Sequence, residues 1–269
     1  MSDDQQRVSL DMLETRLREA ERELVAAIQK RARAGAHMRT ALRGQGDALA
    51  MAVMTCLERL KRQSAKLDLA ELMLRWHVEF PLDMYDAGLQ NVIVSGAEQH
   101  RIMEQARNMF GYAALLQYNK DQRECLTMCM DKEGTIGFMG WVMGPGAGQW
   151  WPMLNETRYH DMRIVGSWPS FSDDTPQAAL IAKGPLAELS DHRTLLIAHD
   201  DHHRLQKIFA EVELEVTEIS RARTLVLFEI GFPVSESDPR LVAARNAGLE
   251  GLRVVGSLPA PNVKESVAA

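Results

Sequence analysis

The stretch that decides the fold runs from Met12 to Met38 and reads MLETRLREAERELVAAIQKRARAGAHM. Apolar residues recur through it at alternating steps of three and four, giving a seam of Leu10, Leu13, Leu17, Ala20, Leu24, Ala27 and Arg31. This spacing is typical of a long helix that packs lengthwise against a partner. Charged residues fill the other faces, and no proline interrupts the pattern. We therefore expect one long N-terminal helix.

Two further helices should follow this one. An apolar stripe over residues 49–60 predicts the second helix, and Asp68 with Glu71 three residues later predicts the start of the third. Pro81 should kink or end that helix. We expect residues 1–88 to form a helical domain, and we expect a homodimer, because the long seam leaves apolar surface that a second chain should cover.

From residue 89 onward the pattern changes to short β-branched runs that alternate with helical stretches. The expected strands are 91–94, 135–139, 162–167 and 178–183, and the expected helices are 97–110 and 120–130. Such alternation predicts an α/β layer with a mainly parallel sheet, here a small α/β domain over residues 89–190.

The next segment, residues 191–262, predicts a ferredoxin-like βαββαβ unit. Its expected strands are 195–199, 214–220, 224–231 and 252–257, with a first helix over 202–211. Asp238-Pro239 is an N-cap followed by proline at the first helical position, which opens the second helix. Residues 263–269 are expected to be a tail. Together these segments predict a multidomain protein, in which a helical domain is followed by α/β domains.

The composition excludes several classes of protein. A net charge of -6 argues against a nucleic-acid binder, which normally carries a basic stripe. No apolar run approaches the roughly 18 residues that a membrane span needs, and the polar start MSDDQQRVSL lacks the features of a secretory signal. Three cysteines do not suggest a disulfide framework. We expect a cytoplasmic protein without a membrane or nucleic-acid partner.

The order of these segments resembles a group of alphaproteobacterial chorismate-mutase-related proteins. The 12–38 stretch is similar to the first helix of the helical chorismate mutases, through its apolar spacing, Glu21 and Arg31. The stretch NVIVSGAEQHRIMEQARNMFG resembles the opening of the prephenate dehydratase catalytic domain. TLVLFEIGFPVSESDPRLVAARNAGLEGLRVVGSLPAP looks like the second half of an ACT domain. The resemblance implies a role in aromatic amino-acid (shikimate and prephenate) metabolism.

The mutase reaction needs several cationic donors around a dicarboxylate, because negative charge develops on an ether oxygen. Arg31 matches one arginine of the family's pattern, but Glu14 stands where a second is required. Leu42 stands at the lysine position, although Arg39 or Arg43 would substitute if the loop shifts. The remaining positions fall near Ala52, Val53 and Ala87. We therefore expect a degenerate mutase site in which ligand binding replaces catalysis.

Other residues have both a functional and a plain structural interpretation. Ser95, before a helix, either helps to bind an anion at the helix N-terminus or only caps the helix. Trp150 and Trp151 either stack on a ring-shaped ligand or cover the sheet. Cys125 and Cys129 are either two zinc ligands or, preferably, buried thiols. The run His199–His203 has metal-ligand residue types, but Asp200 or Asp201 as an N-cap explains most of it.

These observations lead to one functional interpretation and one alternative. The first is a chorismate-mutase-related protein that binds a small carboxylate through Arg31, Arg39, Arg43, Ser95, Trp150 and Trp151. The alternative is a non-catalytic regulatory or assembly protein that uses the helical dimer and the ACT-like unit. If the chain is an enzyme, it is an isomerase of the mutase type; no catalytic residue is assigned, and no cofactor or metal is expected.

Overall fold

The computed structural model describes residues 3–42, 48–64, 69–112, 114–141, 149–170, 175–186, 189 and 191–260. Within the helices, the side chains of residues 3–9, 39, 64 and 69–74 are not described. The chain divides into two compact units, residues 1–43 and 44–269. The expected boundary at residue 88 stays a prediction. The independence of residues 89–190 and 191–262 stays a prediction.

The first unit contains helix α1, Asp3–Leu42, a single helix of 40 residues. This confirms the long N-terminal helix that the seam predicts. Its sequence is rich in alanine, leucine, glutamate and arginine, which have the highest helix propensities, and Gly35 does not end it. No described helix is apolar over the length that crossing a membrane requires.

The second unit begins with α2, Ala48–Ser64, and α3, Leu69–Asp86. Pro81 lies inside α3, and the helix continues five residues past it. The two helices are joined by Arg59, which pairs with Asp83 and with Glu79 at 3.4 Å. Buried side chains from both helices belong to one core cluster with strand residues, so α2 and α3 pack on the sheet.

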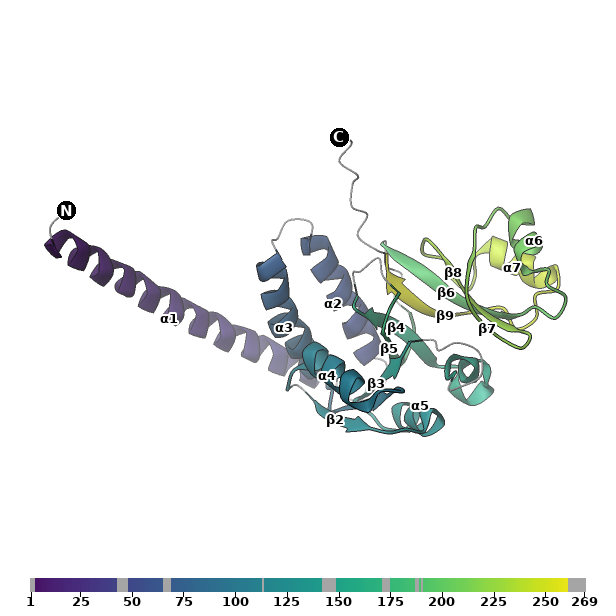
Figure 1. Ribbon diagram of the computed structural model, residues 1–269, viewed down its shortest axis with the longest axis horizontal. Helices are drawn as coiled ribbons and strands as arrows, with labels where there is room; N and C mark the ends of the chain where they lie inside the picture. Colours follow the sequence, from purple (N-terminus) through teal and green to yellow (C-terminus); the bar gives the residue numbers. More distant parts are fainter. Residues whose placement is uncertain are drawn as a thin grey trace. The chain divides into compact units, whose positions relative to one another are not determined.

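One nine-stranded sheet runs through the second unit in the order β2-β1-β3-β5-β4-β9-β6-β8-β7 (Figure 1). The strands are β1 Asn91–Ser95, β2 Leu115–Tyr118, β3 Thr135–Gly140, β4 Met162–Trp168, β5 Ala178–Lys183, β6 His192–His199, β7 Thr217–Ala222, β8 Leu225–Ile230 and β9 Arg253–Pro259. The other helices are α4 Gln99–Phe110, α5 Gln122–Asp131, α6 Leu205–Glu211 and α7 Pro239–Asn246, with 3-10 turns η1 Trp151–Asn155 and η2 Thr157–Tyr159.

The expectation of a mainly parallel sheet is wrong. Strand β1 pairs in parallel with β2 and β3, and β4 pairs in parallel with β9. The pairs β3–β5, β4–β5, β6–β8, β6–β9 and β7–β8 are antiparallel. The difference arises after β3, where the chain returns through β4 and β5, because their short connection forms an antiparallel pair rather than a crossover.

The predicted βαββαβ order is present as β6-α6-β7-β8-α7-β9. Asp238 caps α7 by accepting from the Arg240 backbone N–H, and Pro239 is the first helical residue. In this unit β9 pairs with β6 on one side and, through Ile164 and Gly256, with β4 on the other. The unit therefore does not form a separate sheet but continues the sheet of residues 91–183.

Alternation along the strands separates two faces of the sheet. Ile93, Ile164, Leu195, Leu227 and Val255 belong to one continuous core cluster, which α5 and η1 cover. On the opposite face, α2, α3 and α4 cover the β1–β5 end, whereas α6 and α7 cover the β6–β8 end (Figure 1). Two separate helical layers thus share one face, and the strands between them carry the candidate site.

Candidate functional site

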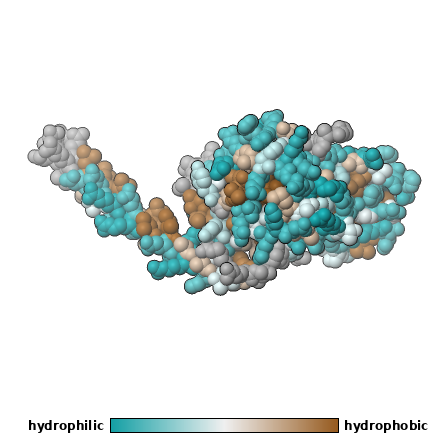
Figure 2. Space-filling view, turned by 90° about the horizontal axis from the view of Figure 1, so that it is seen from below, coloured by the Kyte–Doolittle hydropathy of each residue, from teal (hydrophilic) through white to brown (hydrophobic). Residues whose placement is uncertain are grey.

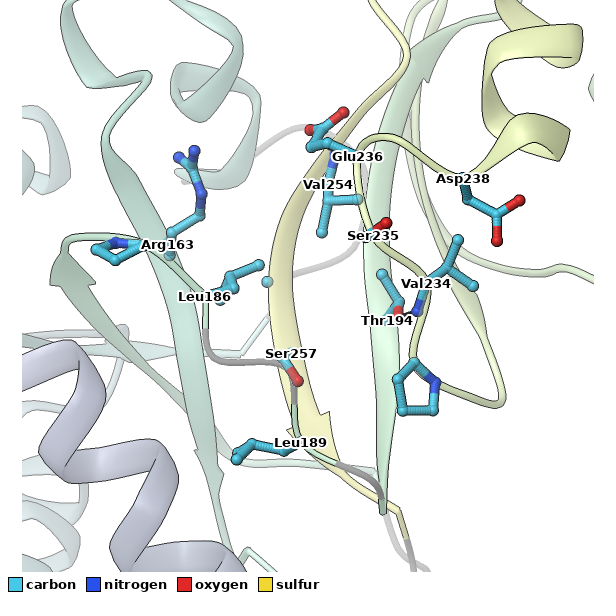
Figure 3. Close-up of a pocket in the computed structure, with 13 residues that line it drawn as sticks. Arg163, Leu186, Leu189, Thr194, Val234, Ser235, Glu236, Asp238, Val254 and Ser257 are labelled. Atoms are coloured by element: carbon cyan, nitrogen blue, oxygen red, sulfur yellow. Dashed lines mark hydrogen bonds between the residues drawn. The ribbon is translucent and has the colours of Figure 1, made fainter.

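A cavity of about 660 Å³ opens between the two helical layers, over β4, β9 and β6 (Figure 3). Arg163 on β4, Thr194 on β6 and Ser257 on β9 form its strand side. The segment after β5 contributes Leu186 and Leu189, and the segment after β8 contributes residues 233–236 and 238. Leu186 packs against the cores of both helical layers, so it bridges the gap in which the cavity lies.

At the floor of the cavity, β4 and β9 approach closely at one point. Ile164 pairs with Gly256, and a Cβ atom on Gly256 would lie 2.6 Å from the Ile164 Cβ. The ladder between β6 and β9 shifts register between Leu195 and Leu196, which is a β-bulge on β9. Bulges bend a strand and re-aim its side chains. The Val254 N–H is consequently not used by β4 and donates to Glu236 Oε1 at 2.6 Å.

Arg163 is the cationic group of the cavity wall. Its Nη1 donates to the carbonyl oxygens of His160 and, at 3.0 Å, Met162. Burial lowers the pKa of Arg163 from its ordinary value, and Asp161 and Glu236 oppose that shift. An arginine remains charged in proteins. Its Nη2 and Nε have no partner among the described residues, so they are available as donors to a ligand.

A second half-buried arginine, Arg253, shares a hydrogen-bond acceptor with Arg163. Arg253 donates from Nη1 to the Leu154 carbonyl at 3.0 Å and from Nη2 to the His160 carbonyl at 2.8 Å. Burial lowers the pKa of Arg253, and the nearby charge of Arg163 lowers it further. Two cations that share the His160 carbonyl raise the local positive potential, and of the two only Arg163 lines the cavity.

The carboxylates on the other side of the cavity already have partners. Glu236 accepts from the Val254 N–H and pairs with Arg245. Asp238 caps α7 and pairs with Arg240 at 2.7 Å, and the hydrogen bond from Arg240 lowers the pKa of Asp238. Both carboxylates are thus held by other cations, although the charge of Glu236 also acts on Arg163.

The rest of the lining is mostly apolar. It consists of Pro185, Leu186, Leu189, Pro233, Val234 and Val254. The polar exceptions are Ser235, Ser257 and Thr194, whose Oγ1 donates to the Phe232 carbonyl at 2.9 Å and accepts from the Val234 N–H at 2.8 Å. An apolar wall with a few convergent polar groups is the usual lining of a small-molecule site.

The residues that the sequence suggested lie elsewhere. Arg31 is half-buried on α1 in the first unit, whereas the Arg39 side chain and the whole of Arg43 lie outside the described residues. Trp150 and Trp151 are completely buried in the core cluster on the opposite face of the sheet, and Trp150 Nε1 donates to the Gly140 carbonyl at 2.8 Å. Their positions agree with packing rather than with stacking on a ligand.

Ser95 ends β1 and is buried. It does not cap the next helix: the N-cap of α4 is Glu98, which makes no side-chain capping bond. Ser95 instead lies beside Cys125, whose pKa is raised by burial to about 11 and lowered in part by the interaction with Ser95. Cys129 is also buried. Within the described ranges, no group of three or more potential ligands could hold a metal ion.

Asp200, in the His199–His203 run, is buried and accepts from the backbone N–H groups of Arg204 at 2.7 Å and Leu205 at 3.1 Å. These bonds hold the segment that leads into α6, but the N-cap of α6 is Arg204, so the expectation of Asp200 or Asp201 as the N-cap is wrong. Arg221 pairs with the same carboxylate at 3.2 Å. A smaller cavity of about 190 Å³ adjoins this segment.

Sequence reasoning missed the cavity, although one signal was present. Arg163 interrupts the apolar run of β4, and Ser257 similarly follows an apolar run in β9. A charged side chain in a buried strand lowers the stability of the folded protein unless hydrogen bonds or an ion pair compensate it, so its presence can indicate a binding site.

Comparisons with known proteins give weak structural similarities. No family model matches the chain, and no curated protein matches it. Among solved structures, prephenate dehydratase from Streptococcus mutans is similar with a TM-score of 0.43 and 11% identity, covering 62% of this chain and 96% of that one. A second structure, described as "GqqA- a novel type of quorum quenching acylases", has a TM-score of 0.44 and 12% identity, covering 65% and 98%. Both TM-scores lie below 0.5, and neither assigns a family or an activity to the chain.

Proposed function

We propose that the chain binds a small carboxylate of aromatic amino-acid metabolism in the cavity beside Arg163, and that it is not a working chorismate mutase. The observation that carries this proposal is the Arg163 guanidinium, which is partly desolvated and keeps Nη2 and Nε free of described partners at the edge of an apolar wall. A guanidinium presents paired donors that match a carboxylate, and such charge-assisted bonds are strong where water is excluded.

The shape and lining support a ligand with a ring. A volume of about 660 Å³ lies within the range of typical small-molecule sites. Leu186, Leu189 and Val254 would contact an apolar ring while Arg163 holds the carboxylate. Ser257 and Ser235 add hydroxyl groups that can bond a hydroxyl or an ammonium group of the ligand. The resemblance to chorismate-related proteins suggests chorismate, prephenate, phenylalanine and tyrosine as probes.

Arg163→Met should weaken binding of whichever probe is accepted by at least about tenfold, because a hydrogen bond to a charged group contributes roughly 1.5–3 kcal/mol. Isothermal titration calorimetry with each of the four probes measures this. The matched control is Arg158→Met, which removes an arginine on η2 that pairs with Asp131 at 3.0 Å and does not line the cavity. Equal affinity in R163M and R158M would place the ligand elsewhere.

The chain is expected not to convert chorismate to prephenate at an enzymatic rate. Glu14 and Leu42 replace two of the required cations, and each lost donor of this kind costs about 2.7–4 kcal/mol of transition-state stabilisation. The measurement is the disappearance of chorismate absorbance with the full chain, with a helical chorismate mutase as positive control. A clear enzymatic rate would overturn this part of the proposal.

The alternative function is that of a non-catalytic regulatory or assembly protein. The observation that favours it is the row of exposed leucines on α1, which is typical of an association surface. Absence of binding to all four probes would favour this alternative.

A further inference from the structure

The net charge around the Arg163 cavity depends on the partners of its carboxylates. Among the described residues, the lining contains one cation, Arg163, and two carboxylates, Glu236 and Asp238. Asp161 adds a third carboxylate, because its charge, like that of Glu236, opposes the fall in the pKa of Arg163. Without their partners, these groups would suit a zwitterion, whose carboxylate would meet Arg163 and whose ammonium would meet a carboxylate.

Each lining carboxylate already has a guanidinium partner. Glu236 accepts from the Val254 N–H at 2.6 Å through Oε1 and pairs with Arg245 through Oε2. Asp238 accepts from Arg240 Nε at 3.0 Å through Oδ1 and from Arg240 Nη2 at 2.7 Å through Oδ2. An ammonium group in the cavity would therefore have to share each of these carboxylates with an arginine, which removes most of its electrostatic gain.

One positive charge remains when the charged groups around the cavity are taken together. The charge of Arg163 lowers the pKa of Arg253, so these two cations also act on each other. The described groups in this set are four guanidinium groups, Arg163, Arg240, Arg245 and Arg253, and three carboxylates, Asp161, Glu236 and Asp238. A ligand with one negative charge balances this set. A second ligand carboxylate would find no further lining cation among the described residues, and an ammonium would add to the positive charge.

Ser257 is a buried polar residue of the lining whose hydroxyl has no hydrogen-bond partner among the described residues. It is 8% exposed and lines the cavity from β9, whereas the hydroxyl of Thr194 makes two bonds with the backbone. A buried hydroxyl without a partner lowers stability, and a ligand oxygen would supply the missing bond. Figure 3 shows Ser257 near Leu189, at the opposite end of the cavity from Arg163. The ligand should therefore carry a neutral polar group, such as a hydroxyl, away from its carboxylate.

The wall between these two ends is apolar. Leu186 lies between Arg163 and Ser257 in Figure 3, and Leu189 and Val254 also line the cavity. The surface of the sheet-containing unit that Figure 2 shows is mostly hydrophilic, so an apolar wall of this kind is a local feature. An apolar ring in the ligand would remove this wall from water, which favours binding.

We infer that the ligand is an aromatic monocarboxylate with a hydroxyl group on the far side of its ring and without an ammonium group. This inference rests on the proposed function, because it takes Arg163 as the partner of the ligand carboxylate. Arg163 precedes and Ser257 follows the pair of Ile164 with Gly256, so strand geometry places their Cα atoms about 8 Å apart. A separation of this order suits one aromatic ring with a short carboxylate chain.

A matched series of compounds tests the inference by isothermal titration calorimetry with the full chain. The reference compound is 3-(4-hydroxyphenyl)propanoate. Tyrosine adds an ammonium group to it, and (4-hydroxybenzyl)malonate adds a second carboxylate; each should bind at least about tenfold more weakly than the reference compound. The compound 3-phenylpropanoate lacks the hydroxyl and should bind about fivefold more weakly, as expected for the loss of one hydrogen bond to a buried hydroxyl.

Ser257→Ala should remove the preference for the hydroxyl group, so S257A should bind the reference compound and 3-phenylpropanoate with the same affinity. The matched control is Ser220→Ala, which removes a hydroxyl on β7 that accepts from Gln149 Nε2 at 3.4 Å and does not line the cavity. S220A should keep the difference of about fivefold between the two compounds.

Tyrosine or the malonate binding as tightly as the reference compound would overturn the inference. The proposed function would survive that result if Arg163→Met weakened the binding of these compounds. Absence of binding by every compound of the series would overturn both. A preference for the hydroxyl group that persists in S257A would overturn the part of the inference that assigns this group to Ser257.

Discussion

Gly256→Ala is expected to lower the free energy of unfolding of the sheet-containing unit by about 3 kcal/mol, the upper part of the range for overpacked sites. A Cβ at this position would lie 2.6 Å from the Ile164 Cβ and 2.8 Å from the Ile164 carbonyl oxygen. The second contact is with backbone, so no rotamer change relieves it. The strands must separate at the pairing of Ile164 with Gly256, which joins β4 to β9.

Urea denaturation followed by circular dichroism measures this loss. The matched control is Gly231→Ala, because a Cβ at Gly231 meets nothing within 4 Å. G231A should stay within about 0.5 kcal/mol of the natural chain, as surface substitutions usually do. Comparable stability of G256A and G231A would mean that the close approach of β4 and β9 contributes little to the fold.

The second large expected effect is a loss of folding stability at low pH, caused by the buried His192. His192 is buried at the start of β6, and neither ring nitrogen has a hydrogen-bond partner among the described residues. Burial lowers its pKa to about 4, and the charges that face it are Glu58, Lys61 and Asp191. In the unfolded chain the His192 imidazole is protonated below its ordinary pKa of 6.5, whereas in the folded chain it stays neutral down to about pH 4. Stability is therefore complete above about pH 6.5 and is lost as the pH falls.

Relative to neutral pH, this histidine is expected to lower the free energy of unfolding by about 2 kcal/mol at pH 5 and by roughly 3 kcal/mol at pH 4. His192→Phe fills the same apolar site without a titrating group, so it should keep most of that stability between pH 7 and pH 5. His100→Gln removes an exposed histidine and should leave the acid loss unchanged. The measurement is the urea midpoint at each pH. An H192F variant as acid-sensitive as the natural chain would exclude His192 as the cause.

The sequence anticipates the parts of this fold that depend on local pattern. The seam predicts α1, and the Asp238-Pro239 pair predicts the start of α7, because both signals lie within a few residues. Strand β2 was missed, since its four residues are too few for a periodic signal. Pro81 does not end α3, since tertiary packing of the helix on the sheet overrides the local penalty.

The strand order and the site depend on long-range contacts that local patterns do not encode. Nothing near residues 253–259 indicates that this strand lies between β4 and β6. The cavity draws Arg163, Thr194, Glu236 and Ser257 from four separate segments, so no motif unites them. Ser95, Trp150 and Trp151 have motif-like contexts in the sequence instead, yet all three side chains are buried and none lines this cavity.

The position of β9 also has a consequence for synthesis of the chain. This strand is the last of the nine to leave the ribosome, and it occupies the middle of the sheet. Until residues 253–259 emerge, β4 and β6 each present an open edge to the solvent. Open strand edges are where chains associate wrongly. A nascent chain of this protein thus stays vulnerable to aggregation until nearly all of its sheet has been translated, and a chaperone that shields strand edges would act during that interval.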